Sequence, residues 1–222
     1  MDLSHLIYKV NINLNNILIF ERKYYMNIEI RKLTPELAED YVHFFDITPH
    51  DENIDEHKCY CVCWCSAKDC VESEFSTREK RRNIALDFVK RGIIQGYVAY
   101  ENEKIIGWCN ANTKSDCLQC ISWKRFMQAV KTDDVSSNIK VKSIYCFVIA
   151  PDFRRKGIAT KLLEYVCEDA ANDGFDYVEA YPNKEAKNLS SEFMGYSEMY
   201  SKSGFNVEYE TEQEFVMRKH LK

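Results

Sequence analysis

The sequence predicts a mixed α/β fold in one domain, with a central sheet flanked by helices. The first observation is Val141–Ala150, a nearly continuous apolar run typical of a central strand buried on both faces. The second is an amphipathic helix from about Gly157 to Asp173, and the third is the apolar strand Tyr177–Tyr181 that follows it. A strand, a helix and a strand in this order form a crossover unit, so the two strands should be parallel neighbours.

The rest of the chain is expected to supply antiparallel strands and the covering helices. Alternating or β-branched and aromatic residues predict strands, and apolar residues at helical spacing predict helices. Strands are expected at residues 11–20, 27–33, 59–65, 96–100, 104–109, 205–210 and 214–220. One helix is expected to begin at Thr34–Pro35, a second to end before Gly92, and a third to lie near residues 195–202. Residues 121–131 are expected to form a short helix or an ordered loop.

The first 25 residues stand apart from this pattern. We expect an N-terminal extension over residues 1–25 and the domain proper over residues 26–222. The strand expected at residues 11–20 is either an extra edge strand or an artefact of the chosen start site. An exposed strand of this kind also makes a homodimer a reasonable expectation.

The bulk composition excludes several classes of protein. Apolar residues make up 45% and charged residues 29%, which is ordinary for a globular domain. The net charge of −5 argues against a nucleic-acid binder that works by bulk positive charge. We find neither a secretory signal nor an apolar stretch long enough for a membrane span, so we expect a cytoplasmic protein with free thiols.

The loop between the buried strand and the helix carries the clearest chemistry. Arg154, Arg155 and Lys156 precede Gly157, and the helix begins with Ile158, Ala159 and Thr160. Backbone amides at a helix N-terminus are unpaired and carry partial positive charge, and Gly157 allows a ligand to approach closely. The loop is therefore predicted to bind a phosphate or pyrophosphate, although a solvated basic loop would show the same residues.

At this point the sequence resembles the GCN5-related N-acetyltransferases (GNAT). Arg154-x-x-Gly157-x-Ala159 is similar to the family's Q/R-x-x-G-x-G/A signature, and Met199-Tyr200-Ser201-Lys202-Ser203-Gly204-Phe205 resembles its late helix. Four further segments are similar to a little-described bacterial branch of this family: Cys61–Trp64, Gly107–Cys109, Cys146–Val148 and Val178–Pro182.

The resemblance implies a fold, a cofactor and its contacts. The sheet would be mixed, mostly antiparallel, and splayed at one parallel strand pair. Acetyl-coenzyme A (acetyl-CoA) would place its pyrophosphate on the loop from Arg154 to Thr160. Its pantetheine arm would pair with the backbone of Phe147, Val148 and Ile149, as an extended peptide adds to a sheet edge.

Two side chains are candidates for proton transfer. The resemblance places Tyr200 near the thioester sulfur, as the acid that protonates the leaving thiolate. Glu179 is a candidate base because a carboxylate amid apolar strand residues is costly unless it is used or paired. The alternatives are that Tyr200 merely packs on the pantetheine and that Glu179 is bonded to a neighbour or faces solvent. At two positions where the family often has asparagine and alanine, this chain has Met194 and Ser197.

The ten cysteines offer a rival interpretation. A strand at residues 59–65 would place Cys59, Cys61, Cys63 and Cys65 on one face, with the pair Cys117 and Cys120 elsewhere. Same-face positions about 6.6 Å apart suit two ligands of one metal rather than four, so we expect a core or pocket-wall role and no metal site. The aromatic residues Tyr60, Trp64, Trp108 and Tyr181 are likewise expected either in an acceptor pocket or in the core.

The resulting prediction is an acetyl-CoA-dependent N-acetyltransferase. It would transfer the acetyl group to a primary amine of a small molecule, or to an exposed amino group, by direct attack in a ternary complex. Two alternatives remain open: a non-catalytic acyl-CoA-binding or sensing module, and a thiol-rich metal-binding protein.

Overall fold

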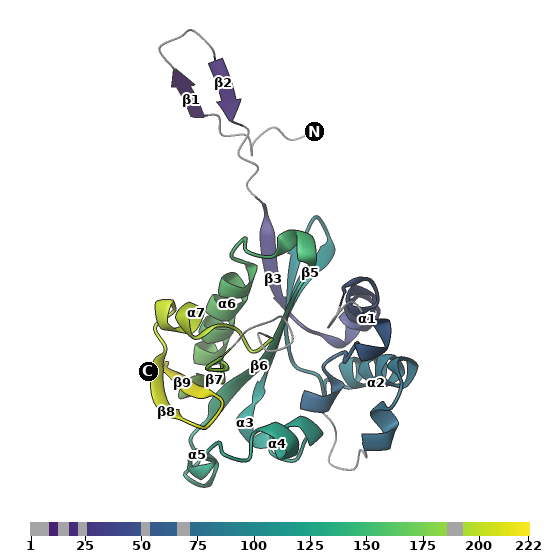
Figure 1. The fold of residues 1–222 in the computed structure, drawn as a ribbon, viewed down its shortest axis with the longest axis vertical. Coiled ribbons are helices and arrows are strands. Elements are labelled where there is room, and N and C mark those ends of the chain that lie inside the picture. Colours follow the sequence, from purple (N-terminus) through teal and green to yellow (C-terminus); the bar gives the residue numbers. More distant parts are fainter. Residues whose placement is uncertain (1–8, 13–17, 22–25, 50–53, 66–71, 186–192) are drawn as a thin grey trace.

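The computed structural model describes residues 9–12, 18–21, 26–49, 54–65, 72–185 and 193–222. Seven strands form one sheet in the order β3-β4-β5-β6-β7-β9-β8 (Figure 1). Their bounds are β3 Ile28–Lys32, β4 Gly96–Glu101, β5 Lys104–Thr113, β6 Val141–Ile149, β7 Tyr177–Ala180, β8 Asn206–Glu210 and β9 Phe215–His220. A separate two-stranded sheet pairs β1 (Lys9–Ile12) with β2 (Leu18–Glu21).

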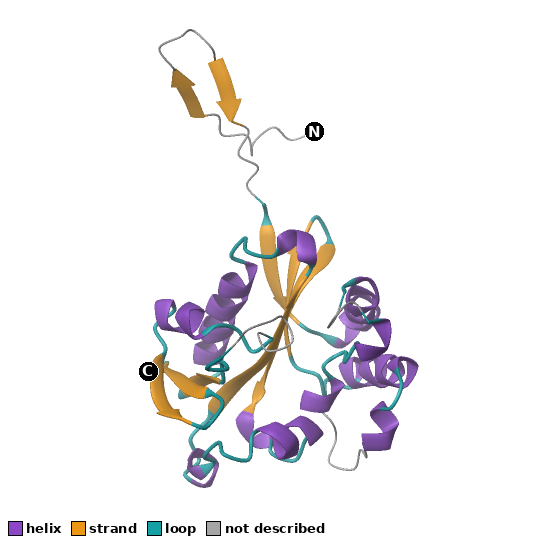
Figure 2. Cartoon of the chain, viewed as in Figure 1, coloured by secondary structure: helices purple, strands orange, loops and turns teal. Residues whose placement is uncertain are grey.

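Helices cover both faces of the seven-stranded sheet (Figure 2). One core cluster lies between the sheet and α6 (Ile158–Asn172) and includes Tyr200 of α7, and a second lies on the opposite face beneath α1, α2 and α4. The α-helices other than α6 are α1 Ala38–Ile47, α2 Arg78–Lys90, α3 Lys114–Cys117, α4 Ile121–Phe126, α5 Asp133–Ser136 and α7 Ser197–Lys202. Short 3-10 turns are η1 Pro35–Leu37, η3 Asp55–His57, η4 Val62–Trp64, η5 Glu72–Phe75 and η6 Pro151–Phe153.

The predicted crossover unit is confirmed. β6 and β7 are parallel neighbours joined by α6, and every other neighbouring pair in the sheet is antiparallel. The two strands pair only from Val141 opposite Tyr177 to Ile144 opposite Ala180. β6 continues to Ile149 along β5, so its outer half has no strand on the β7 side. This is the splayed parallel pair that the fold prediction contains.

Most predicted elements before and after this unit are also confirmed. The β4–β5 hairpin, α2 ending before Gly92, α7, β8 and β9 lie where the sequence places them. The helix predicted at Thr34 begins with the 3-10 turn η1, with Pro35 in its first position, and α1 follows directly. The single strand predicted over residues 11–20 is wrong, because the structure has two strands there, β1 and β2, which pair antiparallel with Asn11 opposite Ile19; residues 13–17 lie outside the described part.

The strand predicted at residues 59–65 is wrong. Tyr60 and Cys61 have φ angles of 49° and 53°, in the left-handed region that a strand excludes. The chain turns there and continues as η4, because Trp64 stacks on Tyr145 of β6 with ring centroids 4.8 Å apart. Long-range packing has overridden the local β-propensity of these residues.

Because there is no strand, the four thiols do not share one face. Cys61 and Cys65 are buried in the core, whereas Cys59 and Cys63 are half-buried. Tyr60, Trp64, Trp108 and Tyr181 are buried in the core on the same face of the sheet. The boundary between an extension and a domain at residue 26 stays a prediction.

Candidate active site

The loop before α6 has the backbone geometry of an anion-binding turn. Arg155 and Gly157 both adopt left-handed φ angles, of 58° and 80°. Such turns direct successive amide groups to one side, forming a concave site for an anion. Gly157 is the N-cap of α6 and its carbonyl accepts the Lys161 N–H at 3.0 Å, so the amides of residues 158–160 precede the first intrahelical bond.

The space over this loop is open. A Cβ added at Gly157 would meet no atom within 4 Å. Arg155 and Lys156 are exposed, with the Lys156 ammonium over the Phe153 ring at 5.3 Å. Arg154 is turned inward instead, since its Nε donates to the Ile149 carbonyl at 3.0 Å and ties the loop to the end of β6. The loop therefore fits a diphosphate through its amides and two exposed cations.

The open edge of β6 leads directly into this loop. Phe147 lies in the α6-side cluster and Val148 packs on the opposite one, as alternation along a strand requires. The Phe147 N–H points to the unpaired side and donates to the Phe193 carbonyl at 2.6 Å. A ligand that pairs with Phe147 must therefore displace Phe193 from this bond.

Tyr200 lies on the same side of the sheet and is wholly buried. It belongs to one cluster with Phe147 and Ile158, and its hydroxyl donates to the Met194 carbonyl at 2.7 Å. Burial raises the pKa of Tyr200 well above its usual value, which keeps the phenol protonated. The two consecutive carbonyls of Phe193 and Met194 thus accept from the Phe147 N–H, which is predicted to pair with the pantetheine arm, and from the Tyr200 hydroxyl, which is predicted to lie near the thioester sulfur.

Glu179 lies in a buried network of four charges. Its carboxylate is 2.8 Å from the Lys114 ammonium and is also paired with Arg218. Asp134 contacts the same two cations, at 3.0 Å from Lys114. The Tyr181 hydroxyl donates to Glu179 at 2.6 Å.

Both oxygens of Glu179 are therefore already bonded to donors. These contacts favour the alternative that Glu179 is bonded to its neighbours, and its role as a base stays a prediction. The other three charged residues of the network lie far from Glu179 in the sequence, so no local pattern could predict them.

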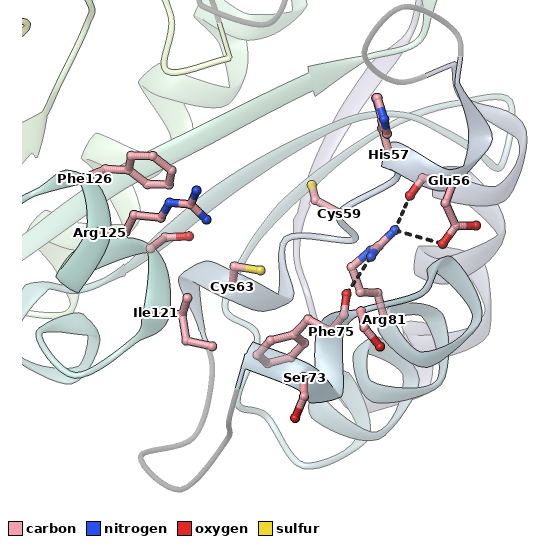
Figure 3. Close-up of a pocket in the computed structure, with 12 residues that line it drawn as sticks. Glu56, His57, Cys59, Cys63, Ser73, Phe75, Arg81, Ile121, Arg125 and Phe126 are labelled. Atoms are coloured by element: carbon pink, nitrogen blue, oxygen red, sulfur yellow. Dashed lines mark hydrogen bonds and ion pairs between the residues drawn. The ribbon is translucent and has the colours of Figure 1, made fainter.

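A cavity of about 610 Å³ lies on the sheet face opposite α6. Its walls come from η3, the Cys59–Cys65 segment, η5, α2 and α4. Figure 3 shows Phe126 and Arg125 of α4 on one side, Glu56, His57 and Arg81 on the other, and Cys59 and Cys63 between them. Sequence reasoning missed this cavity because its walls come from distant segments.

Two buried thiols beside the cavity, those of Cys65 and Cys120, are protonated at neutral pH. Burial raises the pKa of Cys65 to about 12 and that of Cys120 to about 11. None of the described cysteines is in a disulfide bond, and Cys65 accepts hydrogen bonds from Asn110 at 3.1 Å and Asn112 at 3.4 Å. Within the described ranges, no group of three or more histidine, cysteine, aspartate or glutamate side chains is arranged to hold a metal; Cys70 lies outside them.

Comparison with known proteins shows the family to which this chain belongs. The model of the acetyltransferase (GNAT) family matches residues 33–196, so the chain belongs to this family. Acetyl-CoA is the cofactor of the family, and the open strand edge and amide-lined loop of this chain fit it. No curated protein sequence matches the chain. Among the described helices, none is both long and apolar enough to cross a membrane.

Solved structures of GNAT proteins share the fold at low identity. A putative GNAT acetyltransferase from Desulfovibrio desulfuricans has a TM-score of 0.50 at 12% identity, covering 88% of this chain and 99% of its own. The ribosomal-protein-S5-alanine acetyltransferase of Vibrio fischeri has a TM-score of 0.50 at 11% identity, covering 89% and 94%. Mosquito arylalkylamine N-acetyltransferase like 5b has a TM-score of 0.50 at 13% identity, covering 88% and 100%. These likenesses show the fold alone.

Proposed function

We propose that this chain transfers the acetyl group of acetyl-CoA to a primary amine by direct attack in a ternary complex. The acceptor is a small molecule or an exposed amino group. The observation that carries the proposal is the continuity of the open β6 edge with the left-handed turn at Arg155 and Gly157. A strand edge and an anion site in succession suit a ligand with an amide-containing arm and a diphosphate.

The residues that would hold acetyl-CoA follow from this geometry. The amides from Arg155 to Thr160, with the exposed side chains of Arg155 and Lys156, would bind the phosphates. The backbone from Phe147 to Ile149 would bind the pantetheine arm after Phe193 has left the Phe147 N–H. Arg154 would contribute by fixing the loop to Ile149. The bound cofactor supplies an activated acetyl thioester.

The chain's own donors define the proposed chemistry. The Phe147 N–H points to the open edge, where a carbonyl oxygen that gains negative charge would be stabilised. Tyr200 is kept protonated by burial and would donate to the leaving thiolate once its bond to Met194 is released. The attacking amine must be neutral, so a base or a water molecule must take its proton.

Glu179 remains the base that the sequence predicts. Its four-charge network offers a competing explanation for its burial, because removing one partner of such a network leaves the others uncompensated. Measuring both the free energy of unfolding and the turnover of a Glu179 variant distinguishes a catalytic base from a structural member of the charge network.

The second candidate function is acyl-CoA binding without turnover. It is favoured by one observation, the engagement of Phe147 and Tyr200 by the adjacent carbonyls of Phe193 and Met194. If these bonds persisted beside a bound cofactor, neither donor would reach the thioester.

One experiment distinguishes the two candidates. Purified protein is incubated with acetyl-CoA and a panel of primary amines, and N-acetylated products are detected by mass spectrometry. This readout detects the acetylated product itself and needs no thiol reagent, so the cysteines of the chain do not contribute to the signal. Acetylated amine above the protein-free control supports the transferase. CoA binding in calorimetry without product from any amine supports the binding module, and absence of CoA binding contradicts both.

A further inference from the structure

The cavity opposite α6 lies behind the strand residues that carry the open edge. Its walls include Cys59 and Cys63, and the intervening Cys61 is buried in the same core cluster as Cys146 of β6. Trp64, from the same segment, stacks on Tyr145. Cys146 directly precedes Phe147, whose N–H faces the open edge. The cavity wall is therefore packed against the strand that, under the proposed function, holds the cofactor.

The two ligands of a ternary complex must approach from different directions. Phe147, Ile158 and Tyr200 belong to the cluster under α6, whereas Cys59, Cys63 and Phe75 pack in the cluster on the other face. A cofactor held at the loop before α6 leaves the opposite face for the acceptor. The cavity is on that face and has a volume within the range of small-molecule sites.

The cavity is lined largely by apolar side chains and small hydroxyl groups. Aromatic and aliphatic groups come from Phe75, Ile121 and Phe126, and Phe126 is 56% exposed although it is a large apolar residue. Ser73, Ser76 and Ser122 add small hydroxyl groups. Burial of the apolar part of a ligand against these side chains is favourable. The side chains named here offer a peptide backbone no continuous row of hydrogen-bonding groups.

The charges of the lining exclude a polycation. The side chains of the lining that carry a full charge are those of Arg81, Arg125 and Glu56, and the Arg81 guanidinium lies 3.7 Å from the Glu56 carboxylate. Arg81 is fixed in the wall by the carbonyls of Lys58 at 2.8 Å, Phe75 at 2.5 Å and Glu56. A ligand with several positive charges would meet net repulsion here, whereas a single amine is neutral when it attacks.

We propose that this cavity is the acceptor site and that it takes a monoamine carried on an aromatic or branched aliphatic group. The inference rests on the proposed function and narrows its substrate class. Phe126 is a specificity-determining residue that covers the apolar body, and Ser73 lies where a larger side chain would fill the cavity.

The test measures acetylation of 2-phenylethylamine, spermidine and triglycine by mass spectrometry, and binding of 2-phenylethylamine to the CoA-loaded protein by calorimetry. We expect kcat/KM for 2-phenylethylamine to exceed that for the other two by about tenfold or more, which equals ~1.4 kcal/mol. Ser73→Trp should abolish 2-phenylethylamine binding and leave CoA binding intact. Phe126→Ala should raise KM for 2-phenylethylamine about tenfold, the effect of losing one good apolar contact.

Matched controls lie outside the cavity. Ser136→Trp on α5 and Val207→Ala on β8, both exposed positions, should leave binding and KM unchanged. Preference for spermidine or triglycine, or 2-phenylethylamine binding unaffected by Ser73→Trp, would overturn the cavity assignment while leaving the transferase intact. Loss of CoA binding in the unmodified protein would instead count against the proposed function.

Discussion

The carboxylate of Glu179 and the ammonium of Lys114 lie 2.8 Å apart, and their side chains are 0% and 1% exposed. Arg218 and Asp134 complete the network, which joins β7 and β9 to α3 and α5. Two cations and two anions that pair with one another can be buried together, because no charge is left unpaired. If one of the four is removed, one charge is left without a compensating partner. The network therefore stabilises the parallel β6–β7 pair next to the position where the two strands separate.

We predict that Glu179→Gln is strongly destabilising. Neutralising one partner leaves a buried cation uncompensated, so the free energy of unfolding should fall by about 3 kcal/mol. Urea denaturation measures this change, with Glu208→Gln on the exposed strand β8 as the control. Unchanged stability together with a large loss of kcat would instead support Glu179 as the base.

Tyr200→Phe should separate catalysis from binding. The substitution removes the hydroxyl that is now bonded to Met194 and retains the ring that packs edge-on against Phe205 at 5.2 Å. We expect kcat to fall by about 10², the usual contribution of a general acid, with CoA affinity unchanged. Tyr177→Phe on β7 is the control. Full activity of Tyr200→Phe would show that Tyr200 serves only for packing.

Gly195 directly follows Phe193 and Met194, whose carbonyls accept from Phe147 and Tyr200. Its φ is 83°, and an added Cβ would lie 3.0 Å from Met199 and 3.2 Å from the Tyr200 hydroxyl. We expect Gly195→Ala to lower both stability and kcat, since left-handed strain of about 1–2 kcal/mol combines with displacement of Tyr200. Gly204→Ala has a similar φ of 85° but its nearest neighbour is 3.8 Å away, so it should lose stability only. Equal effects on kcat would refute the role of Gly195 in placing Tyr200.

The stability contributed by Asp46 should depend on pH. Burial raises its pKa, but hydrogen bonds from Tyr60 and Arg82 outweigh this effect and hold the pKa below its usual value. A lowered pKa in the folded state stabilises the protein above the unfolded pKa of about 4, and this contribution is lost as the pH falls through the folded value.

Asp46→Asn should therefore be destabilising at pH 7, and the difference from the unmodified protein should shrink below pH about 4. Urea denaturation at pH 7 and below pH about 4 measures this difference in the free energy of unfolding, with the exposed substitution Asp87→Asn on α2 as the control. A difference that is constant with pH would mean that the charge of Asp46 contributes nothing.

The features that the sequence predicts best are those determined by consecutive residues. The crossover unit follows from the apolar run of β6 and the amphipathic α6, and the anion loop follows from Arg154 to Thr160. Tyr200 could be placed only through a family resemblance. The four-residue helices α3 and α5 escaped prediction because one turn is too short to show a period.

Features that depend on distant contacts could not be predicted. The turn at Tyr60 and Cys61 exists because Trp64 stacks on Tyr145, about eighty residues away along the chain. The partners of Glu179 and the walls of the cavity assemble in the same way. The Phe193 and Met194 carbonyls are backbone groups, and no residue type signals them.

The most direct test of the central claim compares CoA affinity in Gly157→Glu and Gly174→Glu by calorimetry. These glycines flank the two ends of α6, have φ angles of 80° and 73°, and have no atom within 4 Å of an added Cβ, so their strain is matched. A carboxylate at Gly157 would repel the diphosphate, and we expect affinity to fall about tenfold or more, ~1.4 kcal/mol, with Gly174→Glu unchanged. Equal CoA affinity in both variants would contradict diphosphate binding at this loop.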